Sequence, residues 1–170
     1  HVNRRRALFE EALDLAAAGV TIDVTAFPVA EGEDAWAAED AVERYWAAGL
    51  PESGLTVTSD AGGSLPVFDA QGQFVRMGVA HPGALLATVQ ALLARGHALG
   101  RILPPFTATP ANHLKLARKG RIAAAADADL LVLDEAGALT DVMARGAWHV
   151  REARSVRWGT FERGTIGDGG

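Results

Sequence analysis

The sequence has no cysteine among its 170 residues. This absence excludes disulfide bridges, thiolate metal ligands and a cysteine nucleophile. Any metal that this chain binds must therefore be held by histidine and carboxylate side chains.

Positive charge is also scarce, since 16 lysines and arginines face 21 aspartates and glutamates and the formal net charge is −5. Long apolar runs are missing as well, because Asp127, Asp129 and Asp134 interrupt the most hydrophobic stretch of the chain. A membrane span needs about 20 apolar residues in succession. We therefore expect a soluble protein without nucleic-acid or membrane partners.

The first residue is His1, and the run Arg4 to Arg6 precedes helix-forming residues instead of an apolar signal core. We interpret this start as a cut and expect a cytoplasmic protein, with the alternative that removal of a signal peptide left the same end. The composition, 49% hydrophobic and 22% charged, is typical of an ordinary globular domain.

The first 60 residues alternate between helix and strand patterns. Apolar residues at helical spacing predict a helix over residues 4–18, which Gly19 ends. Alternating β-branched residues then predict a strand over 20–26 and a second strand over 55–59. Between them, acidic residues at 31–34 predict the start of a helix that stops at Gly49. This order is typical of βα units with a parallel sheet.

After residue 60 the regular alternation of helix and strand patterns ends. Residues 60–80 are rich in glycine and predict a long irregular loop with a turn at 69–73, and helices follow over 82–95 and 110–117. Short antiparallel strands are expected at 130–133, 140–144 and 148–150, and the glycine-rich residues 164–170 predict a disordered tail.

Function in parallel βα arrays gathers at the carboxyl ends of the strands. Asp60 follows the second strand, where a carboxylate can bind a cation or transfer a proton, although an aspartate in a loop often only caps a turn. His1, with Asn3 and Arg4, precedes the first helix. His81, His97, His113 and His149 have no partner at metal-ligand spacing, so we interpret them as surface or capping residues.

Residues 109–122, followed by Asp127, Ala128 and Asp129 and the apolar run to Asp134, resemble the closing signature of the amidohydrolase superfamily. Ala126 stands where that signature usually has glycine. The segments 1–4, 19–25 and 58–68 resemble, in the same order, the isoaspartyl dipeptidase family. This resemblance extends over nearly the whole chain except the tail.

The resemblance implies an α/β fold in which residues 1–117 are the C-terminal part of a (β/α)8 TIM-like barrel and 118–163 are strands of a small β domain. It implies two zinc ions, with His1 a ligand of one and Asp60 a ligand of the other and the proton shuttle. A bridging hydroxide is then the nucleophile. Arg4 and Ser64 match positions that hold the charged ends of a small peptide substrate.

The resemblance also implies that the remaining ligands, paired histidines, a carboxylated lysine and a further histidine, lie upstream of residue 1. We therefore expect an active β-aspartyl dipeptidase and a homo-oligomer at full length, and an inactive fragment here. An amidohydrolase of cyclic amides, of the dihydroorotase or hydantoinase type, and a non-catalytic module remain alternatives. The metal could also be another divalent ion.

Overall fold

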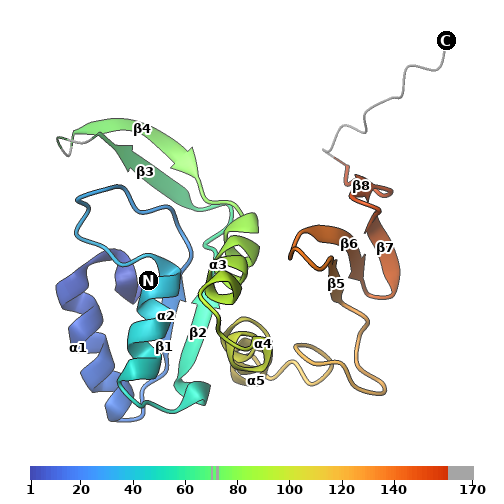
Figure 1. Cartoon of the computed structure of the whole chain (residues 1–170), viewed down its shortest axis with the longest axis horizontal. Coiled ribbons are helices and arrows are strands. Elements are labelled where there is room, and N and C mark those ends of the chain that lie inside the picture. The colour runs from blue at the N-terminus through green and yellow to red at the C-terminus, as the bar shows by residue number, and fades with distance from the viewer. Residues whose placement is uncertain (70, 72, 161–170) are drawn as a thin grey trace. The chain divides into compact units, whose positions relative to one another are not determined.

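The computed structural model describes residues 1–69, 71 and 73–160 (Figure 1). The chain divides into two units, His1–Leu116 and Ala117–Gly170. The predicted tail at 164–170 lies outside the described residues. The assignment of 1–117 to a barrel and of 118–163 to a small β domain stays a prediction.

The first unit is built around a parallel pair of strands, β1 (Ile22–Thr25) and β2 (Leu55–Thr58). The two strands pair in register, so that Ile22 lies opposite Leu55 and Thr25 opposite Thr58. Side chains alternate across a strand, and the aliphatic residues of both strands face the core. The predicted strand pattern of this half is therefore confirmed.

Helices supply the rest of this core (Figure 1). The helices of the first unit are α1 (Arg6–Ala17), α2 (Ala38–Ala47), α3 (Gly83–Ala94), α4 (Leu99–Ile102) and α5 (Ala108–His113), with 3-10 turns η1 (Val2–Arg4), η2 (Glu52–Gly54) and η3 (Pro104–Phe106). Buried residues of this core come from α1, α2, α3 and α4. Phe9 of α1, Tyr45 of α2 and Leu92 of α3 are fully buried beside the strands. As predicted, a glycine follows α1, and Gly19 takes the left-handed φ of 94°.

The prediction of an irregular loop over residues 60–80 is wrong. Most of that segment is an antiparallel hairpin of β3 (Ser64–Phe68) and β4 (Phe74–Val79), which leads away from the helices in Figure 1. Pro66 and several glycines made the segment resemble a loop, but proline is tolerated in a strand with an open edge. The predicted turn at its tip is confirmed, since the Asp69 amide donates to the Gln73 carbonyl.

Two predicted helix limits also need correction. The helix expected from 31–34 begins only at Ala38, because Glu33 closes a local turn by accepting the amide of Ala30. The helix expected over 110–117 is α5, which begins at Ala108 and ends at His113. Lys115, shortly after it, has a positive φ of 56°, which is incompatible with a continuing helix.

The second unit holds an antiparallel sheet in the order β5 (Leu130–Leu133), β6 (Leu139–Ala144), β7 (Ala147–Arg151) and β8 (Arg154–Ser155). The first three strands were predicted and the short β8 was not. Within the described part of the chain, no helix is both long and apolar enough to cross a membrane.

Candidate functional site

Three of the four predicted site residues meet at the carboxyl ends of β1 and β2. The Nε2 atom of His1 lies 3.7 Å from Oδ2 of Asp60, and Nη2 of Arg4 lies 3.7 Å from the same oxygen. All three side chains keep contact with solvent, with exposed fractions of 50% for His1, 31% for Arg4 and 33% for Asp60. The site therefore joins an imidazole, a guanidinium and a carboxylate at an accessible edge.

The fourth predicted residue, Ser64, begins β3 and is exposed. In the part of the chain that the structure describes, no hydrogen bond or ion pair joins its side chain to His1, Arg4 or Asp60. Its predicted role in substrate binding stays a prediction.

The backbone around Asp60 is specialised. Asp60 has a positive φ of 50°, a conformation that aspartate adopts more readily than most residues. The Gly63 amide donates to the Asp60 carbonyl at 2.8 Å, which closes a tight turn. A Cβ atom on Gly63 would lie 2.8 Å from both the carbonyl oxygen and Oδ1 of Asp60. The absence of a side chain at Gly63 therefore leaves the space that the Asp60 carboxylate occupies.

The imidazole of His1 is oriented by a contact with the last residue of β1. Its Nδ1 atom is hydrogen-bonded to the hydroxyl of Thr25, the last residue of that strand. Asn3 in turn binds the Thr25 backbone, since its amide donates to the Thr25 carbonyl and its oxygen accepts the Thr25 N–H, both at 2.9 Å. Thr25 and Asn3 are fully buried. The imidazole is therefore held by buried, hydrogen-bonded residues, and its Nε2 atom faces Asp60.

Beside Thr25, the polar face of the strand pair carries a second carboxylate. Asp23 accepts hydrogen bonds from the hydroxyls of Thr56 and Thr58, each at 2.7 Å. These bonds tie β1 to β2 through side chains as well as through the backbone.

Arg4 is held by an aromatic ring. Its guanidinium carbon lies 4.8 Å from the centroid of Phe27, which follows β1. This cation–π contact positions the charge beside Asp60 while both groups remain accessible.

Of the four other histidines, three have structural contacts, in line with the sequence interpretation. The Nδ1 of His81 accepts the amide of Gly83, the first residue of α3. His97 contacts Glu43 at 2.6 Å, and His113 contacts the hydroxyl of Thr21 and the carbonyl of Ser53.

The donor set of His1 and Asp60 fits part of a metal site. An imidazole nitrogen and a carboxylate oxygen are ordinary ligands of divalent cations, and at 3.7 Å they are too far apart to satisfy each other by a hydrogen bond. Two ligands do not make a complete site, however. Among residues 1–69, 71 and 73–160, no group of three or more His, Cys, Asp or Glu could hold a metal ion.

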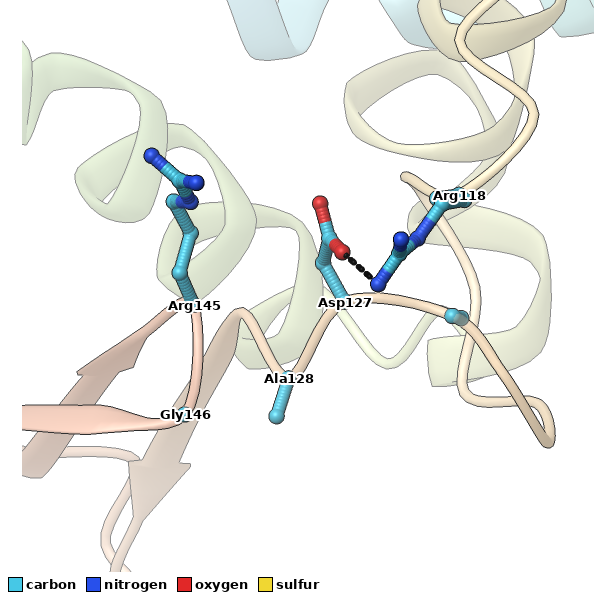
Figure 2. A pocket seen from close by; sticks show the side chains of 6 residues that line it. Arg118, Asp127, Ala128, Arg145 and Gly146 are labelled. Carbon is cyan, nitrogen blue, oxygen red and sulfur yellow. Dashed lines mark ion pairs between the residues drawn. The ribbon is translucent and has the colours of Figure 1, made fainter.

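The second unit contains a polar cavity of about 360 Å³ that includes none of the predicted site residues. Figure 2 shows the Asp127 carboxylate in this cavity, paired with Arg118 at 2.7 Å. Lys119 donates to Asp127 and Asp129, and these hydrogen bonds lower the pKa of both carboxyls. Both carboxylates of the Asp127, Ala128, Asp129 signature are therefore engaged in ion pairs with Arg118 or Lys119, and these pairs stabilise this segment of the chain.

No family model matches the chain. Among solved structures, a beta-aspartyl dipeptidase from Fervidobacterium islandicum AW-1, in complex with beta-Asp-Leu dipeptide, is 34% identical with a TM-score of 0.79. The match covers 95% of this chain and 42% of that one. A second structure of beta-aspartyl dipeptidase from that organism is 29% identical, with a TM-score of 0.75 and coverage of 95% and 39%. This chain thus spans about two fifths of their length.

An N-acetylglucosamine-6-phosphate deacetylase from Thermotoga maritima has the same fold over 84% of this chain and 50% of its own, with 18% identity and a TM-score of 0.53. Both kinds of neighbour are members of the amidohydrolase superfamily, and this chain is similar to them in fold. The two beta-aspartyl dipeptidase structures are similar to this chain in sequence as well as in fold.

Thr25 and Asp23 belong to this site although sequence reasoning did not single them out. The signal was present, because strict alternation in β1 places both side chains on the face opposite Ile22 and Val24. A polar residue buried at the carboxyl end of a strand is a candidate for a supporting role even when it carries no charge.

Proposed function

We propose that the complete protein containing this chain hydrolyses β-aspartyl dipeptides at a binuclear zinc site. The observation that supports this most is the likeness, at 34% identity over 95% of the chain, to a beta-aspartyl dipeptidase in complex with beta-Asp-Leu. On this proposal β1 and β2 are neighbouring strands near the end of a (β/α)8 barrel. The second unit returns the chain to a small β domain.

His1 and Asp60 would hold the metal, together with ligands that lie outside this chain. A bound divalent cation supplies Lewis acidity toward a carbonyl oxygen and a hydroxide nucleophile near neutral pH. The 3.7 Å separation of Nε2 and Oδ2, and the access of both to solvent, support this assignment.

Asp60 would also move the proton. Its carboxylate accepts a proton when water attacks the peptide carbonyl and returns that proton to the leaving amine. The accessible position of Asp60, whose side chain is 33% exposed, is suited to both transfers.

Arg4 and Ser64 would bind the substrate. In a β-linked aspartyl peptide the α-carboxylate is free, and a guanidinium can bind a carboxylate through two parallel hydrogen bonds. Arg4 carries its charge within 3.7 Å of Asp60, so a carboxylate bound there would bring the adjacent peptide bond close to the proton acceptor.

Two other functions remain as alternatives. Hydrolysis of cyclic amides would use the same metal chemistry, and it is disfavoured by the sequence of residues 60–68, which fits the dipeptidases better. A non-catalytic module is disfavoured by the meeting of His1, Arg4 and Asp60, because an unused site has no need for these three groups together.

The test uses Asp60→Asn in the complete protein with β-Asp-Leu as substrate. We expect kcat to fall by roughly 10²–10⁴-fold, since general acid–base catalysis contributes that much, while the thermal unfolding temperature stays near that of the wild type. Asp14→Asn, at an exposed position of α1, is the matched control and should keep full activity. Near-normal turnover by Asp60→Asn would remove Asp60 from the mechanism.

A further inference from the structure

We propose that Thr25 and Asn3 are positioning residues that fix the imidazole of His1 with its proton on Nδ1 and its Nε2 lone pair directed at the metal. This inference rests on the proposed function and adds two residues to it. It concerns two uncharged, fully buried side chains, Asn3 in η1 and Thr25 at the end of β1, to which the family resemblance assigned no role.

The first step is the state of the imidazole. A neutral histidine carries one proton, and a nitrogen that binds a cation must offer its lone pair. If Nε2 faces the metal, the proton lies on Nδ1, and the Thr25 hydroxyl next to Nδ1 accepts it. The second nitrogen of a metal-binding histidine commonly donates to such a partner, which sets both tautomer and ring orientation.

The second step is the rigidity of the acceptor. The Thr25 hydroxyl can orient His1 only if Thr25 is itself fixed, and the Asn3 side chain binds both backbone groups of that residue. The Asn3 side chain donates its remaining amide hydrogen to the backbone carbonyl of Trp36 at 2.9 Å, and the backbone amide of Trp36 donates to the backbone carbonyl of Asn3. The amide group of Asn3 thus has every donor satisfied and cannot turn over without losing these bonds.

The third step is the connection between segments. His1 precedes η1 and Asn3 lies within it, Thr25 ends β1, and Trp36 lies in the loop before α2. One buried asparagine therefore links three segments that all border the site. A shift of any of them would be transmitted to the imidazole through Thr25.

The experiment measures the zinc dissociation constant of the complete protein by competition with a chelator, alongside the thermal unfolding temperature. Thr25→Val replaces the hydroxyl by a methyl group of similar volume, and Thr25→Ser keeps it. We expect Thr25→Val to weaken zinc binding by roughly 10–100-fold, as loss of an outer hydrogen-bond partner typically does, and Thr25→Ser to restore most of it.

Thr88→Val is the matched control, because Thr88 is also buried and its hydroxyl is also hydrogen-bonded, to the carbonyl of Ala84 within α3. It should leave zinc affinity unchanged. If Thr25→Val fails to fold, the pair Thr25→Ala and Thr25→Ser serves instead, since both remove the methyl group and they differ in the hydroxyl.

His1→Ala distinguishes a failure of the positioning role from a failure of the proposed function. If His1→Ala loses zinc and Thr25→Val or Thr25→Ala binds it as the wild type does, the positioning role is overturned and the proposed function stands. If His1→Ala binds zinc with unchanged affinity, the assignment of His1 as a ligand fails, and the positioning role fails with it.

Discussion

At the scale of single residues, the site depends on Gly63. Its hydrogen atom faces the Asp60 carbonyl and carboxylate, where a Cβ would come within 2.8 Å. We expect Gly63→Ala to displace the Asp60 side chain and to lower kcat/KM for β-Asp-Leu by roughly 10²-fold, because small displacements of catalytic groups have effects of that size. Steady-state kinetics with β-Asp-Leu would measure this.

The control for that substitution is Gly100→Ala in α4. A Cβ added to Gly100 would have no neighbouring heavy atom within 4 Å, and this residue has no positive φ, so the methyl group should be tolerated in the helix. Equal activity of Gly63→Ala and Gly100→Ala would show that the turn after β2 does not position Asp60.

At the scale of elements, α2 is joined to the end of α3 by an exposed charge cluster. Glu43 of α2 accepts hydrogen bonds from His97 and Arg95, each at 2.6 Å, and Asp40 pairs with the same arginine. The hydrogen bond from His97, followed by that from Arg95, lowers the pKa of Glu43 below its ordinary value of 4.5. The ionised form of Glu43 therefore stabilises the folded state.

The sign of the pH dependence follows from that lowered pKa. The contribution of Glu43 is complete above pH 4.5 and is lost as the pH falls through the lower folded pKa. We expect Glu43→Gln to reduce stability by about 0.5–1 kcal/mol at pH 7 and by progressively less below pH 4.5. Thermal unfolding at several pH values would measure this.

Glu10→Gln, at an exposed position of α1, provides the comparison for a glutamate without such partners, and it should shift the unfolding temperature little at any pH. A penalty for Glu43→Gln that stays constant between pH 7 and the acid range would contradict the electrostatic explanation.

Elements also differ in how far they could be predicted. β1 was predictable because Ile22 and Val24 alternate with polar residues, and that period identifies a half-buried strand. The β3–β4 hairpin was not, because Pro66 and Gly78 are residues that interrupt most strands. The start of α2 was misplaced because the acidic residues at 31–34 stabilise turns as readily as helix ends.

The candidate site was predictable to a similar extent. Two βα units fit between His1 and Asp60, which indicates convergence of these residues at one edge, and the two side chains lie 3.7 Å apart. Their roles stay predictions. The contribution of Asn3 and Thr25 could not be read from the sequence, because it depends on hydrogen bonds between residues 22 positions apart.

At the scale of the whole molecule, the surface of the first unit is incomplete for a parallel sheet. In the described residues, β1 pairs only with β2, so each strand has an open edge. Parallel strands are normally buried on both faces, and a two-stranded sheet is rarely stable by itself. Val79 of β4 is 72% exposed. These surfaces are suited to contacts with further parts of a protein.

The last prediction therefore compares this 170-residue chain with the complete protein that contains it. We expect the isolated chain to self-associate through its open edges, to retain no stoichiometric zinc and to leave β-Asp-Leu intact, because His1 and Asp60 supply only two donors. Light scattering after size-exclusion chromatography, metal analysis and a hydrolysis assay test the three points. A monomeric isolated chain with turnover like that of the complete protein would show that the site needs no residues from elsewhere.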